Sequence, residues 1–529
     1  MDLHSAGHRR GVACAPHFAA AEAGRDILAE GGNALEAMIA MAATIAVVYP
    51  HMNHVGGDGF WSIREPSGRI RTIMAPGPAG AAAQPELYRD YETIPSRGPL
   101  AALTVPGAIG GWAVAMEMAH ALRGKLPLAV LLAFAIDRAR TGYTVTRSQA
   151  RVTAEKLAEL APVPGFADAF LLEGEAPPEG TVLKQEAFAA TLDHLARAGL
   201  DDFYRGDIAR ELAADLEQIG SPLAREDFAR YRAAMREPLH ADLKDAALYN
   251  TDAPTQGVAS LMILALFDRL GVTEAEGFDH VHCLVEATKR ALRMRDRVVC
   301  DPGHLAHALE RVLEPRFIAG EAMKIDRSKA APWPLGSSEG DTIWMGAADS
   351  SGLVVSYIQS LYWEFGSACV LPRTGVVMQN RGINFSLQRG ALNFLVPGRV
   401  PFHTLNPALA VFKDGRVMAY GAMGGDGQPQ TQGAVFTRYA LFNEPLADAI
   451  DRPRWVLGRT WGDPRTALRL EPRFDDALID ALVHAGHEVE FVNEPYSDVM
   501  GHAGAVVLHP DGSLEGAHDP RSDGGATGV

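Results

Sequence analysis

The amino-acid sequence changes character after residue 325, and this change limits its fold more than any other feature. The first part has apolar residues at helical spacing in residues 17–30 and 33–50 and over much of 129–313. Residues 328–341 are rich in Pro, Gly and Ser and predict an exposed loop. The sequence therefore predicts a helix-rich first two thirds, then a loop, then a last third of another kind.

The last third is typical of β-structure. Residues 342–349 and 353–360 predict two strands joined by a turn at residues 350–352. Further short strands are expected at residues 408–412, 417–420 and 503–509. The coarse picture is therefore a helix-rich first two thirds and a strand-rich last third.

Composition and charge exclude several classes of protein. The 529 residues include 49 Lys and Arg and 65 Asp and Glu, a formal net charge of −16, which argues against nucleic acid or a membrane surface as the main partner. The four cysteines form no CxxC pair and predict neither a disulfide framework nor a structural zinc site. No apolar segment of the export type follows the first basic residues, and residues 42–48 are too short to span a bilayer, so we expect a cytoplasmic protein.

Glycine and histidine clusters do not point to a cofactor. The glycine-rich segments 56–60, 105–111 and 423–430 match no nucleotide-binding pattern. The histidine pairs in HMNH and HLAH lack further ligands at a diagnostic spacing, so we expect no metal and no cofactor. Adjacent glycines, as at Gly424 and Gly425, can offer two backbone N–H groups to an oxyanion.

Thr342 stands where the loop meets the first strand of the last third. A threonine that opens a strand is by itself an ordinary β-former. After cleavage of the bond between Asp341 and Thr342, however, its own amine could act as the base for its hydroxyl. This position makes Thr342 the candidate nucleophile.

Several short segments, in a fixed order along nearly the whole chain, carry a family resemblance. They are GGNALEAMIA, YPHMNHVGGDGF, VPGAIGGW, FYRGDIA, PTQGV, DTIWMGAADSSGLVVSYIQSLYWEFGS, TGVVMQNRGINFS, RVPFHTLNPAL, GAMGGDGQPQ and DPRSDGGA. In this order they resemble the γ-glutamyltranspeptidase family. QNRG, PFHTL and MGGDGQPQ resemble most the branch of that family that includes oxamate amidohydrolase.

The resemblance implies an N-terminal-nucleophile hydrolase of the α+β class, a four-layer αββα sandwich made as one precursor that cleaves itself. It implies cleavage between Asp341 and Thr342 into residues 1–341 and 342–529, which together form one structural domain. The two products are expected to stay together as an αβ heterodimer, and two such units to pair. Ser360 stands at the place of a hydroxyl that supports the nucleophile, and Gly424 and Gly425 stand at the place of the oxyanion pair.

The expected substrate pocket departs from the family pattern. Where the family holds an α-carboxylate with Arg, this sequence has Ala75, and where it holds an α-amino group with Asp, it has Asn384. Tyr362 replaces an asparagine, and His403 and Thr404 replace two serines. A neutral amide pairs less well with an ammonium than a carboxylate does, so recognition of a γ-glutamyl group is in question.

Arg381 stands where the family has Gln, close in sequence to Asn380 and Asn384. We hypothesise that it clamps the carboxylate of a smaller substrate, and the alternative is a structural ion pair. The sequence thus favours an autoprocessing threonine amidohydrolase that acts on a small carboxylate amide such as oxamate. One alternative is a γ-glutamyl hydrolase or transferase acting on glutathione or related amides, and another is an uncleaved scaffold protein.

Overall fold

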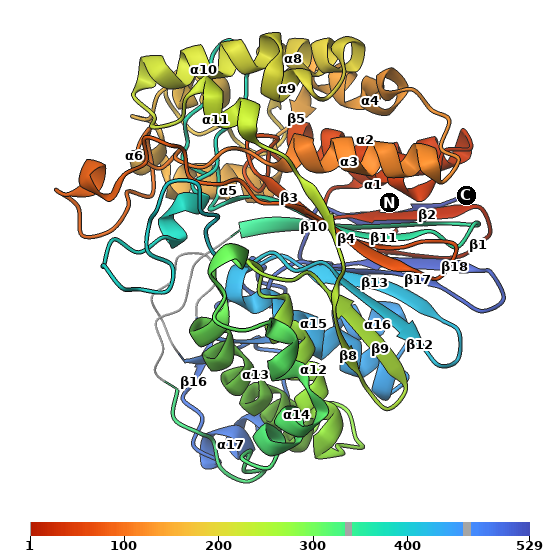
Figure 1. Cartoon of the computed structure of the whole chain (residues 1–529). Helices are drawn as coiled ribbons and strands as arrows, with labels where there is room; N and C mark the ends of the chain where they lie inside the picture. The colour runs from red at the N-terminus through yellow and green to blue at the C-terminus, as the bar shows by residue number, and fades with distance from the viewer. Residues whose placement is uncertain (1, 334–340, 459–466) are drawn as a thin grey trace.

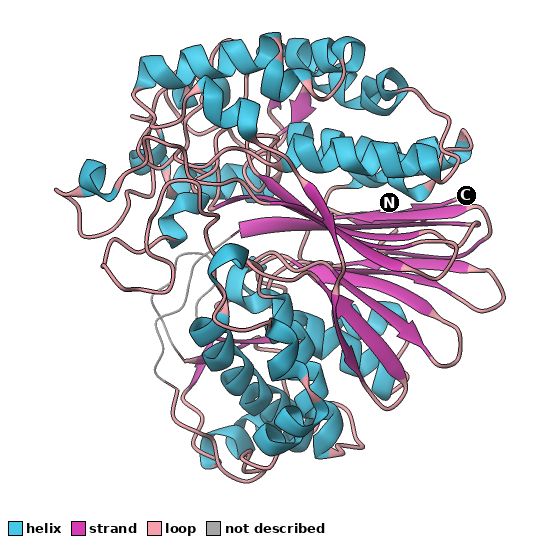
Figure 2. Cartoon of the chain, viewed as in Figure 1, coloured by secondary structure: helices cyan, strands magenta, loops and turns pink. Residues whose placement is uncertain are grey.

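The computed structural model describes residues 2–333, 341–458 and 467–529. Two seven-stranded antiparallel sheets lie face to face between two layers of helices (Figures 1 and 2). This is the expected four-layer αββα sandwich of the α+β class. Most of the loop expected at 328–341 lies outside the described residues.

The two sheets are built from both parts of the chain. The first sheet runs, in spatial order, β19 (Gly525–Gly528), β2 (Gly11–Ala15), β10 (Asp341–Asp349), β11 (Val354–Tyr362), β3 (Asp58–Arg64), β4 (Ile70–Ala75) and β7 (Ala234–Arg236). The second runs β1 (His4–His8), β18 (Leu514–His518), β17 (Ala503–Leu508), β13 (Val417–Ala422), β12 (Ala408–Phe412), β9 (Ala246–Asn250) and β8 (Leu239–Asp242). Smaller sheets join β14 (Trp455–Leu457), β15 (Leu468–Leu470) and β16 (Val489–Phe491), and β5 (Tyr143–Thr144) with β6 (Val182–Leu183).

Helices cover the outer face of each sheet. On the first sheet lie α1 (Phe18–Ala29), α2 (Ala34–Val48) and α3 (Ala108–Ala121). The other helices on this side are α4 (Leu128–Thr141), α5 (Arg147–Glu155), α6 (Leu157–Leu160), α7 (Phe166–Phe170), α8 (Glu186–Ala198), α9 (Asp202–Arg205), α10 (Asp207–Ile219) and α11 (Arg225–Arg230), and of these α4 packs on α2 and α8 on α4. The layer on the second sheet contains α12 (Gly257–Leu270), α13 (Phe278–Val298), α14 (Pro315–Ala322), α15 (Gln428–Phe436), α16 (Leu446–Asp451) and α17 (Asp476–His484). Among the described residues, no helix is both long enough and apolar enough to cross a membrane.

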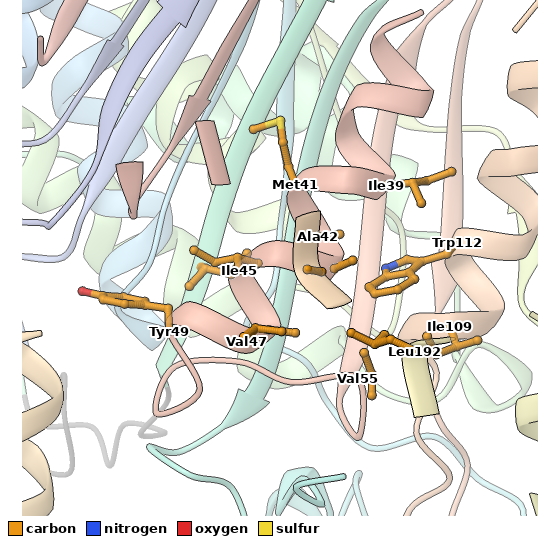
Figure 3. Close-up of a cluster of buried hydrophobic side chains, with 14 of the residues drawn as sticks. Ile39, Met41, Ala42, Ile45, Val47, Tyr49, Val55, Ile109, Trp112 and Leu192 are labelled. Atoms are coloured by element: carbon orange, nitrogen blue, oxygen red, sulfur yellow. The ribbon is translucent and has the colours of Figure 1, made fainter. Parts of the chain in front are cut away.

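Helix α2 forms the apolar support behind the central strands. Every residue of α2 is buried, and its N-terminus is closed by a capping box between Asn33 and Glu36. The helix packs against β10 and β11, and Ile45, Val47 and Trp112 lie in the same cluster of side chains (Figure 3). A helix that is apolar on all sides is typical of a protein core. It therefore gives β10 and β11 a rigid backing.

Trp344 ties β10 to the second sheet. Its fully buried indole lies in the core between the sheets, and its Nε1 donates to Ser356 Oγ over 2.9 Å. Gly421 and Gly504 face this ring so closely that a Cβ on either would lie 2.1 or 2.4 Å from an indole atom. Glycine is required at both positions because the space is already filled. The strand that carries Thr342 is thus fixed from both faces.

The predicted elements of both ends of the chain are confirmed. Residues 17–30 and 33–50 form α1 and α2, and the predicted strands form β10, β11, β12, β13 and β17. The division into a helical first part and a strand-rich last part holds less well. Strands β2 and β3 flank the central pair β10–β11 of the first sheet and β4 follows β3, although all three come from the part expected to be helical. Strands β7, β8 and β9 likewise interrupt the stretch that was expected to be mostly helical. Strand β7 has three residues, β8 four and β2 five, too few to show a clear period.

Candidate active site

Thr342 lies at an irregularity in the pairing of two central strands. The register of β10 against β11 shifts between Asp341 and Ile343, so Thr342 alone faces Ser360 and Leu361. Two residues opposite one form a β-bulge, which re-aims the side chains around it. The bulge brings the hydroxyl oxygens of Thr342 and Ser360 to 3.3 Å from each other.

The Thr342 side chain is fully buried and has polar neighbours. Besides Ser360, the side-chain amide of Gln428 reaches it, with Nε2 donating to Thr342 Oγ1 over 3.3 Å. Gln428 is the first residue of α15, so the second sheet's helical layer contributes directly to this site. The backbone of Asp341 pairs with β11, while its side chain lies outside the described residues.

Ser360 connects Thr342 to a buried cation. Its Oγ accepts the backbone N–H of Tyr362 at 2.8 Å and Nη2 of Arg381 at 3.2 Å. Thr342 and the Arg381 guanidinium are therefore separated by only two hydrogen-bond lengths. Any anion held by Arg381 would lie beside the Thr342 hydroxyl.

Arg381 is fully buried, and within the described ranges it forms no ion pair. Its Nη1 donates to Thr404 Oγ1 over 3.4 Å, its guanidinium carbon lies 4.1 Å from the centre of the Tyr362 ring, and its Nε has no hydrogen-bond partner in the described part of the chain. Burial lowers the pKa of Arg381 to about 10, with the charges of Tyr362 and Asp58 opposing the shift. Arg381 is thus a cation at neutral pH with donors left for an anion.

Tyr362 adopts an uncommon backbone conformation that shapes this cluster. Its φ is 87°, in the left-handed region that few residues other than glycine occupy. This conformation points its N–H at Ser360, while its phenol OH donates to Asn384 Oδ1 over 2.7 Å. Strain of this kind persists where the surrounding structure fixes it, and it often marks functional sites.

Gly424 and Gly425 form the turn between β13 and α15. Both have positive φ, 111° and 53°, and Gly424 precedes the short 3₁₀ turn Gly425–Gly427. In the part of the chain that the structure describes, neither of their N–H groups donates to another backbone group. Buried N–H groups are nearly always paired, so this pair is suited to an oxygen anion. Gln428 follows on the same turn and reaches Thr342, which places the glycines at the same site.

The two asparagines predicted at the site hydrogen-bond to other protein groups and not to Thr342. Asn380 accepts the Trp363 N–H at 3.1 Å and donates to the Ser96 carbonyl at 2.9 Å. Asn384 accepts from Tyr362 and donates to the Phe402 carbonyl at 2.9 Å. Both amides are therefore engaged by protein groups.

His403 and Thr404, although adjacent in sequence, have different hydrogen-bond partners. Thr404 contacts Arg381, whereas His403 has Nε2 2.7 Å from Asp58 Oδ2 and Nδ1 2.8 Å from the Pro401 carbonyl. Burial lowers the pKa of His403, and the hydrogen bonds to Asp58 and Pro401 oppose the shift. Since both ring nitrogens already have partners, the ring has no donor left for a substrate.

Two residues at the site were not identified from the sequence. Gln428 stands in the QPQ segment directly after the glycine pair, and a glutamine there carries no signal of its own. Asp58 stands in GGDGF, and its Oδ1 accepts N–H groups from Gly77 and Gly107, each at 3.0 Å, and from Gln379 at 3.1 Å. Asp58 therefore fixes the position of the segment around residues 76–78. This is the segment in which the family has its carboxylate-binding Arg and this chain has none.

A second cluster has the residue types of a metal site. His282 and Glu286 of α13 and His487 lie within 4.8 Å of one another. The ring nitrogens His282 Nδ1 and His487 Nε2 are 2.8 Å apart. Glu286 accepts from the Lys289 ammonium at 2.7 Å and from the Ala331 N–H at 3.2 Å. An ammonium already neutralises this carboxylate, so the cluster serves to hold the segment that leads to residue 333.

The arrangement has the components for acyl transfer: a buried hydroxyl on a central strand, a supporting hydroxyl, two unpaired N–H groups and a buried cation. This site, in a sandwich of two sheets between two helical layers, defines the class of N-terminal-nucleophile hydrolases. The chain belongs to the gamma-glutamyltranspeptidase family, whose sequence profile matches residues 20–529.

Individual relatives cover the chain almost completely. It is 52% identical over 519 residues to the oxamate amidohydrolase proenzyme of Klebsiella pneumoniae, covering 98% of both chains. It is 39% identical to the glutathione hydrolase-like YwrD proenzyme of Bacillus subtilis, covering 97% of each. Among solved structures, cephalosporin acylase from Bacillus halodurans matches with a TM-score of 0.91 and 31% identity over 99% of this chain and 97% of that one. The chain is therefore an enzyme of the amidohydrolase type found in this family.

Proposed function

We propose that this protein is an autoprocessing threonine amidohydrolase that hydrolyses oxamate. The observation that carries the proposal is the buried Arg381 guanidinium, two hydrogen-bond lengths from the Thr342 hydroxyl. In oxamate the carboxylate is bonded directly to the amide carbon. A carboxylate held by Arg381 would therefore place that carbon beside Thr342. The 52% identity to an oxamate amidohydrolase proenzyme supports the same substrate.

Self-cleavage prepares the nucleophile. The Thr342 hydroxyl attacks the carbonyl carbon of Asp341, the peptide nitrogen leaves as the acyl group moves to oxygen, and water hydrolyses the resulting ester. The products are residues 1–341 and 342–529, held together as a heterodimer. Thr342 then carries a free amine that can serve as the base in turnover.

Turnover repeats the same chemistry on the substrate. The amine takes the hydroxyl proton as Thr342 Oγ1 attacks the amide carbon, and the N–H groups of Gly424 and Gly425 stabilise the negatively charged oxygen. Ammonia leaves, and an oxalyl ester remains on Thr342. Water hydrolyses the ester and releases oxalate.

A γ-glutamyl substrate fits this geometry less well. In a γ-glutamyl group three carbons separate the scissile carbonyl from the α-carboxylate, whereas Arg381 lies close to Thr342. The ammonium partner is also missing, because Asn384 is committed to Tyr362 and Phe402. Because the chain is also similar to a glutathione hydrolase-like protein, glutathione is assayed beside oxamate.

Intact mass of the purified protein beside a Thr342→Ala variant tests the maturation step. We expect two fragments from the unsubstituted protein, the smaller beginning at Thr342, and one uncleaved chain from the variant. Parallel assays of the cleaved protein should detect ammonia from oxamate and no glutamate from glutathione. Glutamate release without ammonia release would support the γ-glutamyl alternative, and a single inactive chain in both samples would support a scaffold protein.

A further inference from the structure

Gln428 is the residue at the site for which neither the family resemblance nor the comparisons supply a role. It is fully buried, and its amide nitrogen Nε2 donates to Thr342 Oγ1 over 3.3 Å. The oxygen that is to attack the substrate thus accepts a hydrogen bond from a group that cannot act as a base.

A chain of hydrogen bonds fixes the orientation of this amide. Asn406 Nδ2 donates to the Thr404 carbonyl at 2.9 Å and to Gln428 Oε1 at 3.0 Å. A flipped Asn406 would turn its oxygen toward the Thr404 carbonyl, and a flipped Gln428 would turn its NH₂ toward that of Asn406. The first flip would place two oxygens against each other and the second two NH₂ groups. Gln428 can therefore present only its N–H to Thr342.

We propose that Gln428 is a catalytic residue that stabilises negative charge on Thr342 Oγ1. The proposal rests on the proposed role of Thr342 as nucleophile. Oγ1 gains charge twice in each cycle: when its proton passes to the amine during attack, and when it leaves the acyl carbon during ester hydrolysis. A preorganised N–H donor lowers the barrier at both points.

The same helix offers a matched control. Gln430 is equally buried on α15, but its Nε2 donates to the carbonyls of Asp426 and Leu457, at 2.9 and 3.0 Å. Gln430→Met therefore removes a buried amide of the same helix without removing a donor to Thr342. Any loss that comes only from weaker packing of α15 should appear in both variants.

The first comparison is Gln428→Met with Gln430→Met, each normalised to its cleaved fraction by intact mass. We expect Gln428→Met to lower kcat on oxamate about 10- to 100-fold below the control with KM little changed, since the lost hydrogen bond goes to a charged oxygen and not to the substrate. Self-cleavage, which uses the same oxygen, should slow by a similar factor. Equal kcat values in the two variants would overturn the proposal.

The second comparison uses Gln428→Glu, which keeps the shape and makes the donor depend on pH. A protonated carboxyl can accept from Asn406 and donate to Thr342, whereas an ionised one only accepts. The ratio of variant to unsubstituted kcat should therefore rise as the pH falls, while the ratio for Gln430→Met stays flat. A flat ratio for Gln428→Glu would contradict a donor role even if the variant were poorly active.

Thr342→Ala separates the failure of this inference from the failure of the proposed function. If Thr342→Ala is uncleaved and inactive while Gln428→Met and Gln430→Met are equally active, only the role of Gln428 is wrong. If Thr342→Ala is cleaved and active, the nucleophile is another residue, and both proposals fail.

Discussion

At the scale of single residues, Arg381 is the strongest electrostatic feature of the site. A buried guanidinium normally lies next to a carboxylate, because an uncompensated charge is costly to bury. The described residues supply none within ion-pair distance, and the hydroxyls of Ser360 and Thr404 and the ring of Tyr362 surround it instead. The structural ion pair considered from the sequence has no partner here. A substrate carboxylate would supply the missing charge.

Arg381→Ala should therefore impair substrate binding more than folding. We expect kcat/KM for oxamate to fall about 100-fold, mainly through a higher KM, because a charge-assisted hydrogen-bonded contact is lost. Arg381→Lys should recover only part of this, since an ammonium can neither bind in bidentate fashion nor stack as well on Tyr362. Steady-state kinetics on oxamate measure both, and an unchanged KM in Arg381→Ala would exclude the clamp.

The lowered pKa of Arg381 sets an upper pH limit for binding of the substrate carboxylate. Burial favours the neutral guanidine, so the cation that binds carboxylate exists below pH 10 and is lost as the pH rises through about 10. We expect kcat/KM for oxamate to decline above that pH, and this decline to be absent in Arg381→Ala. A pH profile of kcat/KM, which reports groups of the free enzyme, measures it, provided circular dichroism shows that the fold persists.

At the residue scale, the sequence indicated positions that carry a motif, whereas the contacts of single side chains depend on the fold. Thr342, Ser360 and Arg381 were expected at the site and do lie together. His403 and Asn384 were expected to touch substrate, but their partners come from residues 58, 401, 362 and 402. Gln428 was missed because its importance comes from a contact across 86 positions of the chain.

At the scale of elements, the turn between β13 and α15 carries several groups of the proposed mechanism. It carries both glycines with positive φ and, three residues later, the amide that reaches Thr342. A Cβ at Gly424 would meet Gly501 at 3.5 Å, an ordinary contact, so the demand for glycine here comes from the backbone angle and not from lack of space.

Gly424→Ala should displace this turn and with it an oxyanion donor. We expect turnover of cleaved enzyme to fall about 10²- to 10³-fold, the typical cost of one such donor. Gly31→Ala is the matched control, since Gly31 has a φ of 90° and open space around its Cβ position but lies at the end of α1. Both variants should lose similar stability in a denaturant titration, and only Gly424→Ala should lose turnover. Similar turnover in the two would remove the turn from the mechanism.

Element prediction depended on length and on local signals. Helix α2 was foreseen because Asn33 caps it and apolar residues follow throughout, and the β10–β11 hairpin because a turn separates two apolar runs. The three-residue strand β7 and the four-residue strand β8 are too short to show a period. Strand β8 forms a local hairpin with β9, whereas β7 pairs with β4, which lies far earlier in the chain, so the place of β7 depends on the whole fold.

At the scale of the whole molecule, residues 1–341 and 342–529 are interleaved in both sheets. In the first sheet β10 and β11 lie between β2 and β3, and in the second β18, β17, β13 and β12 lie between β1 and β9. Neither part contains a complete sheet. Main-chain hydrogen bonds along several strand pairs therefore join these two parts, and they would hold the products of the proposed cleavage together.

We expect the cleaved protein to unfold in one transition, with the two chains separating only as it unfolds. Gel filtration at low concentration should keep both in one peak, and denaturant titration followed by gel filtration should show dissociation and loss of structure together. The two parts produced separately should remain unfolded. Separation of folded chains under native conditions would contradict this expectation.

If the chain is cleaved before Thr342 as proposed, the position of β10 in the middle of a sheet makes maturation depend on correct folding. The scissile bond meets Ser360 and Gln428 only when β10 has paired with β11 and α15 has docked, contacts that span 18 and 86 positions of the chain. A misfolded molecule does not assemble them and stays an uncut, inert polypeptide. Only molecules that have completed folding then become active, and no separate protease is needed to activate them.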